Sequence, residues 1–166
     1  MSGEQEMSHA RSLDGVLDKI EITEVINAYC LHFDRAEADA VIAQFTEDAT
    51  VDYGPDVSPM VGVSEFGPMI KGGLAGLFAA TSHHVSNISI QFQGQDSAAS
   101  ICYLYAWHRY LETNEESELW GQYHHEFRRT PDGWKISRLV LRAAGMKNFH
   151  RENMHPIGRK SASDPP

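Results

Sequence analysis

The apolar residues of this chain change their spacing once, near Thr81, and this change constrains the fold more than any other feature of the sequence. Before Thr81 they recur every three or four residues, as in helices with one apolar face. After it they alternate with polar residues, as in strands. Helices that precede a run of strands joined by short turns are typical of an α+β domain rather than of an α/β domain.

Three helices are expected in the first half of the chain. Ser12 is the candidate N-cap of a long helix over residues 13–33, and a short helix follows over residues 37–45. The third, over residues 63–78, contains Pro68 and several glycines, so we expect it to be short, bent or broken. The apolar stripe of the long helix consists of Leu13, Val16, Leu17, Ile20, Ile22, Val25, Ile26, Tyr29, Cys30 and Phe33.

One short strand and four longer ones are expected after the first helices. The short strand covers residues 49–53, and the others cover 84–92, 98–111, 119–129 and 134–143. Pro131-Asp132-Gly133 is a hairpin signal between the last two. Such a sheet, antiparallel or mixed, can curl around the long helix and leave a pocket at its open end. We expect a flexible N-terminus over 1–12, one domain over 13–149, and a C-terminal lid or disordered tail over 150–166.

The composition excludes several classes of partner. Asp and Glu number 23 against 14 Lys and Arg, a formal net charge of −9. This charge repels nucleic acid and anionic membranes, so neither is an expected partner. The polar first 12 residues lack the apolar run of a secretory signal, and the two cysteines form no disulfide or zinc pattern. A cytoplasmic protein is the resulting prediction.

Four fragments, in this order and spacing, resemble SnoaL-like domains of the NTF2-like superfamily. They are residues 22–35 with Phe33-Asp34-Arg35, residues 45–53, residues 81–87 with His83-His84, and residues 131–136. The pattern is most similar to the group that contains scytalone dehydratase and the hexachlorocyclohexane dehydrochlorinase. The resemblance implies a cone in which about three N-terminal helices pack inside a strongly curved sheet.

The resemblance also implies a set of site residues. The family's catalytic dyad falls on Asp34 and His83, with Tyr53 and His108 as further catalytic candidates. The family's polar pair on the next strand is not kept, and Gln122 and His124 take those places. The candidate substrate-binding residues are Tyr29, Gln122, His124 and Phe149.

These residue types predict proton abstraction. A neutral histidine accepts a proton near physiological pH, and a carboxylate on its other ring nitrogen fixes the tautomer and stabilises the imidazolium. Tyr53 could hydrogen-bond a carbonyl oxygen, and His108 could serve as the acid for a departing hydroxyl. The function predicted is a cofactor-independent lyase, of the dehydratase or dehydrohalogenase type, that acts on a small hydrophobic carbonyl or aromatic-type substrate.

Other interpretations of the same residues stay open. The dyad also suits a proton-shift isomerase or a cyclase, and the fold also suits a small-molecule binder or a protein like the small subunit of ring-hydroxylating dioxygenases. Tyr53 could be an ordinary strand aromatic, and His108 a core or interface histidine. Adjacent His-His pairs place one ring on each face of a sheet, so no metal site and no cofactor are predicted.

The strand over 98–111 has apolar side chains on both faces. Tyr103, Tyr105 and Trp107 alternate with Leu104 and His108, so one face needs a further cover. We expect a homotrimer, with a dimer as the alternative. Residues 146–157, which include Phe149 and Met154, are expected to close over the mouth of the pocket.

Overall fold

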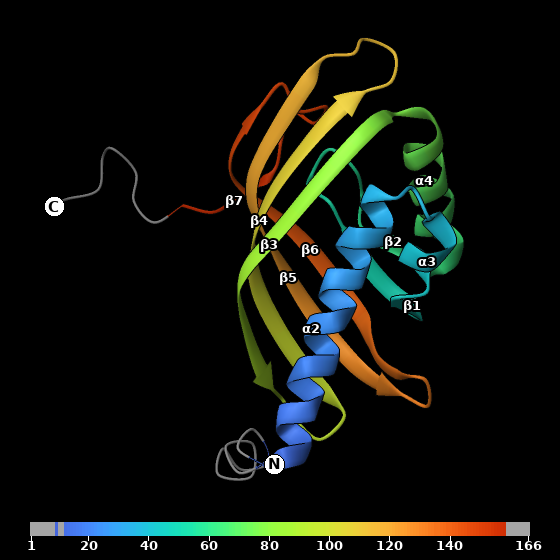
Figure 1. Cartoon of the computed structure of the whole chain (residues 1–166). Coiled ribbons are helices and arrows are strands. Elements are labelled where there is room, and N and C mark those ends of the chain that lie inside the picture. Colours follow the sequence, from blue (N-terminus) through green and yellow to red (C-terminus); the bar gives the residue numbers. More distant parts are fainter. Residues whose placement is uncertain (1–8, 10–11, 159–166) are drawn as a thin grey trace, which may run out of the picture.

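Three helices pack against one curved sheet in the computed structural model, which describes His9 and residues 12–158 (Figure 1). Predictions for residues 1–8, 10–11 and 159–166 lie outside this part. The helices are α2 (Leu13–Asp34), α3 (Ala38–Ile42) and α4 (Val63–Gly76). The strands are β1 (Phe45–Asp52), β2 (Met60–Val61), β3 (Phe78–Phe92), β4 (Ser97–Tyr110), β5 (Glu116–Thr130), β6 (Gly133–Lys147) and β7 (His155–Pro156).

The sheet is mixed and does not close into a barrel. Its strand order is β2-β1-β6-β5-β4-β3, with β7 beside β6. The four long strands from β3 to β6 are antiparallel neighbours, whereas β1 and β7 each pair with β6 in parallel. Figure 1 shows the long strands curving past α2, with α3 and α4 at one side. The predicted α+β class and the curved sheet are therefore confirmed, while the two-residue strands β2 and β7 are additions.

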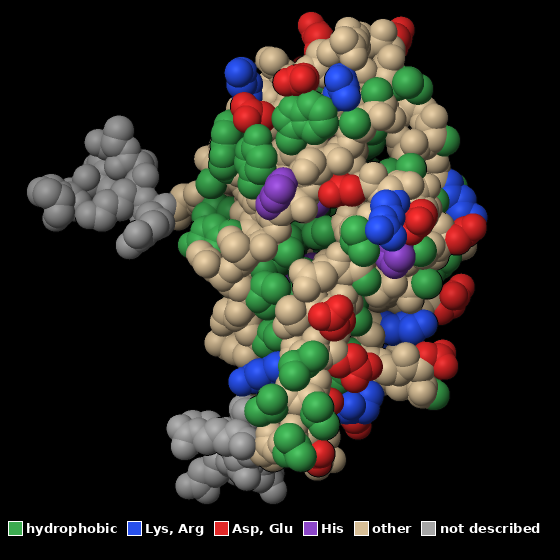
Figure 2. All heavy atoms as spheres, viewed as in Figure 1, with side chains coloured by type: hydrophobic (Ala, Val, Ile, Leu, Met, Phe, Trp, Pro, Cys, Tyr) green, Lys and Arg blue, Asp and Glu red, His purple; other side chains and the backbone are tan. Residues whose placement is uncertain are grey.

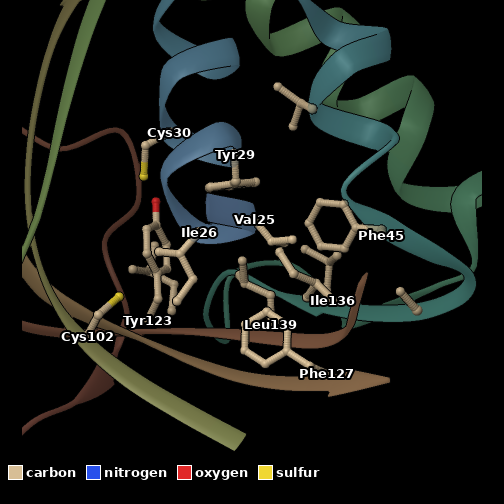
Figure 3. Packing of buried hydrophobic residues seen from close by; sticks show 14 of the residues in the cluster. Val25, Ile26, Tyr29, Cys30, Phe45, Cys102, Tyr123, Phe127, Ile136 and Leu139 are labelled. Carbon is tan, nitrogen blue, oxygen red and sulfur yellow. The ribbon is translucent and has the colours of Figure 1, made fainter. Parts of the chain in front are cut away.

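Helix α2 supplies the centre of the core. The Ser12 hydroxyl caps it by accepting a hydrogen bond from the Gly15 amide at 3.0 Å, as predicted. From Ile22 onward, the predicted stripe is turned toward the core, and Ile22, Val25, Ile26, Tyr29 and Cys30 are buried. Figure 3 shows Val25 and Ile26 close to Phe127, Ile136 and Leu139 of the strands, all of them buried.

The predicted apolar stripe is wrong over the first two turns of α2. Leu13, Val16, Leu17 and Ile20 are exposed, and the buried face there consists of Gly15 and Asp18. Figure 2 shows apolar side chains gathered on the surface over this end of the helix. The apolar stripe does not face the core here because Asp18, with its polar partners, occupies the buried side of these turns.

This cluster ties the start of α2 to the far end of the sheet. The Asp18 carboxylate accepts hydrogen bonds from the Trp134 indole at 3.0 Å and from the Arg129 guanidinium at 2.6 Å, and it contacts His9 at 2.9 Å. Burial opposes ionisation of Asp18, but the donors from Arg129, Trp134 and His9 outweigh it and lower its pKa. A buried carboxylate is thereby fully partnered, as burial requires.

Helix α4 is one continuous helix of 14 residues with Pro68 inside it, so the expectation of a short or broken helix is wrong. One face buries Phe66, Gly67, Ile70 and Leu74 against the rest of the domain. A Cβ added at Gly72, Gly73 or Gly76 would meet nothing within 4 Å. The glycines therefore lie where they disturb no packing, and the buried face holds the helix together despite its weak intrinsic propensity.

The outer face of the sheet carries exposed apolar side chains. Ile101, Tyr103 and Trp120 are 43%, 51% and 45% exposed, respectively. They belong to two neighbouring strands, β4 and β5. The homotrimer, with a dimer as the alternative, stays a prediction. In the part of the chain that the structure describes, no helix is both long and apolar enough to cross a membrane.

The buried His125 makes the stability of the fold depend on pH. Its side chain lies between Tyr123 and Phe127, and burial, with a smaller effect of His124, lowers its pKa to about 3. The unfolded chain, with a His pKa near 6.5, binds this proton first, so stability falls as the pH drops from about 6.5 toward 3. Between about pH 7 and pH 5 this group alone should cost about 2 kcal/mol.

His125→Gln should therefore reduce the loss of unfolding free energy between pH 7 and pH 5 by roughly that amount, as measured by urea denaturation. The matched control is His84→Gln, which alters an exposed histidine and should leave the loss unchanged. An unchanged pH dependence in His125→Gln would contradict the assignment.

Candidate active site

One pocket opens on the concave face of the sheet. It lies among α2, α4, the inner faces of strands β3 to β6 and the segment that follows β6, and it holds about 630 Å³ of space including its open mouth. Most of its wall is apolar and aromatic. The side chains that could carry chemistry there are Tyr29, Tyr53, His83, His108, Tyr123, His150 and Arg151.

The carboxylate of Asp34, the last residue of α2, fixes the start of β3. Its Oδ1 accepts hydrogen bonds from the Thr81 hydroxyl at 2.7 Å and from His83 Nδ1 at 2.6 Å. Its Oδ2 accepts from the His83 backbone amide at 2.8 Å. Three donors on one carboxylate leave it little freedom, so the contact between Asp34 and His83 is part of the fold.

This geometry decides the tautomer of His83. An ionised carboxylate only accepts, so Nδ1 must carry the proton that it donates, and in the neutral ring the lone pair is then on Nε2. Burial opposes the charge of Asp34, but the hydrogen bonds from His83 and Thr81 and the proximity of the imidazole outweigh it, so its pKa is lowered. His83 lines the pocket and its side chain is 4% exposed, whereas Asp34 stands behind it.

The adjacent histidines point to opposite faces of β3, as strand alternation predicted. The His83 ring packs edge-on against Phe33 at 5.0 Å and His108 at 5.4 Å between ring centroids. The His84 side chain is exposed on the other face, where it contacts the Ser82 hydroxyl at 2.9 Å. Only the first of the pair can act inside the pocket.

His108 is buried beside the dyad and is neutral near pH 7. Its ring stacks on Phe78 with 4.9 Å between centroids, and its Nδ1 lies 3.5 Å from the Ser117 hydroxyl. Burial first, and then the proximity of His83 and His150, lower its pKa to about 3. His108 therefore offers a ring N–H of neutral imidazole, not the proton of an imidazolium.

Two tyrosines meet at another part of the pocket wall. The Tyr29 and Tyr53 hydroxyls are 2.8 Å apart, and both rings are buried. Burial raises the pKa of Tyr53 to about 12, despite the opposing effects of Tyr29 and Arg151, and burial also raises the pKa of Tyr29. Both phenols keep their protons, so one hydroxyl can donate to the other and leave one proton for a ligand.

The structure does not bring Gln122 and His124 into this pocket. They lie on the outer face of β5, where His124 Nε2 contacts the Gln122 side-chain oxygen at 3.0 Å. Tyr123 faces the pocket between them, because it pairs with Cys102, which shares the inner parity of His108. The alternation of β5 was visible in the sequence, but its register was not, and a shift of one residue exchanges the faces.

Sequence reasoning missed several other lining residues. Phe149 lies at the pocket as expected, together with His150 and Arg151 from the same segment. Phe33 and Phe78 complete the aromatic wall, and Thr81 supports Asp34 from outside it. Within His9 and residues 12–158, no group of three or more His, Cys, Asp or Glu side chains could hold a metal ion.

The protonation state of His108 can be measured directly. We expect the ring nitrogen signals of His108, assigned by comparison with His108→Asn, to remain those of neutral imidazole at pH 5, because its pKa is about 3. Exposed His84, read in the same ¹⁵N spectra, serves as the reference for a solvated ring. Imidazolium signals from His108 at pH 5 would contradict its neutral state.

Comparison with known proteins places this geometry in a family. The family model of the SnoaL-like domain matches residues 14–140. An uncharacterized protein of Mycobacterium tuberculosis is 32% identical over 137 residues, which cover 78% of this chain and 87% of the relative.

Solved structures agree with this match. A scytalone dehydratase candidate from Novosphingobium aromaticivorans is 28% identical with a TM-score of 0.83, covering 89% of this chain and 97% of that one. A hexachlorocyclohexane dehydrochlorinase from Novosphingobium barchaimii is 16% identical with a TM-score of 0.74, covering 87% and 99%. At 16% identity the second likeness shows the fold alone. With its matched segment and this architecture, the chain belongs to the SnoaL-like family and has the NTF2-like fold.

Proposed function

We propose that this protein is a lyase that removes a proton from a small, largely apolar carbonyl compound and expels water or halide. The observation that carries the proposal is the 2.6 Å contact between Asp34 Oδ1 and His83 Nδ1 at the edge of an apolar pocket. The likeness to a scytalone dehydratase candidate supports the reaction class. A pocket without this contact would instead have supported a binder or a non-catalytic subunit.

His83 is the base in this proposal. Its Nε2 carries a lone pair and belongs to a ring that lines the pocket, so it can approach a C–H bond of a bound ligand. The imidazolium that forms lies against the Asp34 carboxylate, which stabilises the new positive charge without taking the proton. No nucleophile is required for this step.

The Tyr29 and Tyr53 pair holds the carbonyl oxygen of the substrate. Removal of a proton beside a carbonyl moves negative charge onto that oxygen, and a preorganised O–H donor stabilises the charge as it develops. Whichever tyrosine accepts the hydrogen bond between the two hydroxyls keeps its own O–H proton for donation to a ligand. The raised pKa of Tyr53 keeps this proton on the phenol throughout.

His108 assists the leaving group by a hydrogen bond. Its ring lies 5.4 Å from that of His83, so both can face one small ligand. Because His108 is neutral, it donates a hydrogen bond from a ring N–H to the departing oxygen or halide and keeps its own proton. The proton taken from carbon stays on His83 until it passes to the expelled hydroxide, which forms water, or to solvent when halide is expelled. The two histidines thus divide the tasks of base and donor according to their surroundings.

The proposal predicts loss of activity without loss of fold in dyad variants. With 3-hydroxy-1-tetralone, whose dehydration gives 1-naphthol, the wild type should release the fluorescent product. Asp34→Asn and His83→Asn should each slow this release by about 10²- to 10⁴-fold, because positioned general bases contribute that much. His84→Asn alters the exposed neighbour and should keep the wild-type rate.

Hydrogen–deuterium exchange at carbon 2 of the same ketone, followed by NMR in D₂O, separates the alternatives. Exchange without loss of water would point to a proton-shift isomerase that uses the same dyad. Dyad variants that keep the wild-type rate, or a wild type that catalyses neither exchange nor dehydration, would contradict the proposed reaction.

A further inference from the structure

Arg151 places a permanent positive charge at the apolar pocket. Of the described side chains that line the pocket, it is the one Lys or Arg. The centre of its guanidinium lies 5.9 Å from the centroid of the Tyr53 ring, so the charge is on the tyrosine side of the cavity. The proposed steps of proton abstraction do not use this residue.

The segment that carries Arg151 is held firmly on the domain. The Asp56 carboxylate accepts hydrogen bonds from the backbone amides of Glu152 and Asn153 at 2.7 and 2.8 Å, and from the Asn153 side chain at 2.7 Å. Farther along, His155 Nε2 lies 3.0 Å from both carboxylate oxygens of Asp52. Arg151 is therefore anchored from the residue that follows it, and a ligand need not order a free tail.

In the described part of the chain, Arg151 forms no salt bridge of 4.0 Å or less with a carboxylate. The nearby Asp56 accepts hydrogen bonds from Asn153 and Glu152, which lower its pKa, and the charge of Arg151 lowers that pKa further from a longer distance. A guanidinium presents five N–H donors in a planar fork that matches the two oxygens of a carboxylate. The overall charge of −9 repels anions in general, so an acidic ligand needs such a local cation.

We propose that the pocket takes a ring compound that carries a carboxylate, and that Arg151 binds this carboxylate. Resting on the proposed function, this narrows the preferred substrates to cyclic carbonyl compounds that also carry a carboxylate, which the pocket binds more tightly than neutral compounds of the same shape. The aromatic wall contacts the ring, the Tyr29 and Tyr53 pair lies close to the ketone oxygen, and the guanidinium positions the acid. Arg151 is thus a residue that determines specificity.

Binding of two probes of equal shape tests this proposal without any turnover. Isothermal titration calorimetry compares 2-naphthoate with neutral 2-naphthamide on the full chain. The wild type should bind the naphthoate at least about tenfold more tightly, since charge-assisted hydrogen bonds contribute roughly that much. Arg151→Gln should remove this preference by weakening naphthoate alone, and Arg151→Lys should retain part of it.

Arg138→Gln is the matched control, because Arg138 pairs with Glu126 on the outer face of the sheet and should not affect either probe. Equal affinity of the two probes for the wild type would overturn the proposal, as would an equal loss of both in Arg151→Gln or a failure of naphthoate to bind. This experiment measures binding and not turnover. Its result therefore tests the role of Arg151 independently of the reaction proposed for Asp34 and His83.

Discussion

The carboxylate of Asp34 is the interaction on which the site depends. It ends the long helix, where a negative charge is electrostatically unfavourable, and three donors from β3 compensate for that position. Two of these donors belong to His83, so the same contacts that join helix to sheet also orient the imidazole. One group therefore both joins α2 to β3 and fixes the orientation of the His83 ring before any ligand arrives.

The apolar pocket assigns different states to similar side chains. Burial keeps His108 neutral, and Tyr53 keeps its phenolic proton. Nδ1 of His83 is instead hydrogen-bonded to the Asp34 carboxylate. One pocket thus holds an imidazole with a carboxylate partner, a neutral N–H donor and a pair of O–H donors, which is the set that the proposed elimination uses. Arg151 adds the charge that these groups lack.

Several parts of the site could be predicted from residue order alone, and others could not. The positions of Asp34, His83, Tyr53 and Phe149 follow from a helix end, a strand start and their resemblance to a family pattern. Gln122 and His124 were placed on the wrong face because alternation does not reveal which parity is inside. For the same reason Tyr123, which lines the pocket, was not among the predicted site residues.

The sequence by itself determined the α+β class, the cap at Ser12 and the opposite orientations of His83 and His84, since these follow from local spacing and backbone geometry. Tertiary structure decided the rest. Strand register placed Tyr123 in the pocket, the buried Asp18 cluster displaced the apolar stripe of α2, and packing held α4 together through Pro68. The contacts of Asp52 and Asp56 with the segment after β6 brought Arg151 to the mouth. Each of these outcomes depends on a partner distant in the chain, which local sequence does not specify.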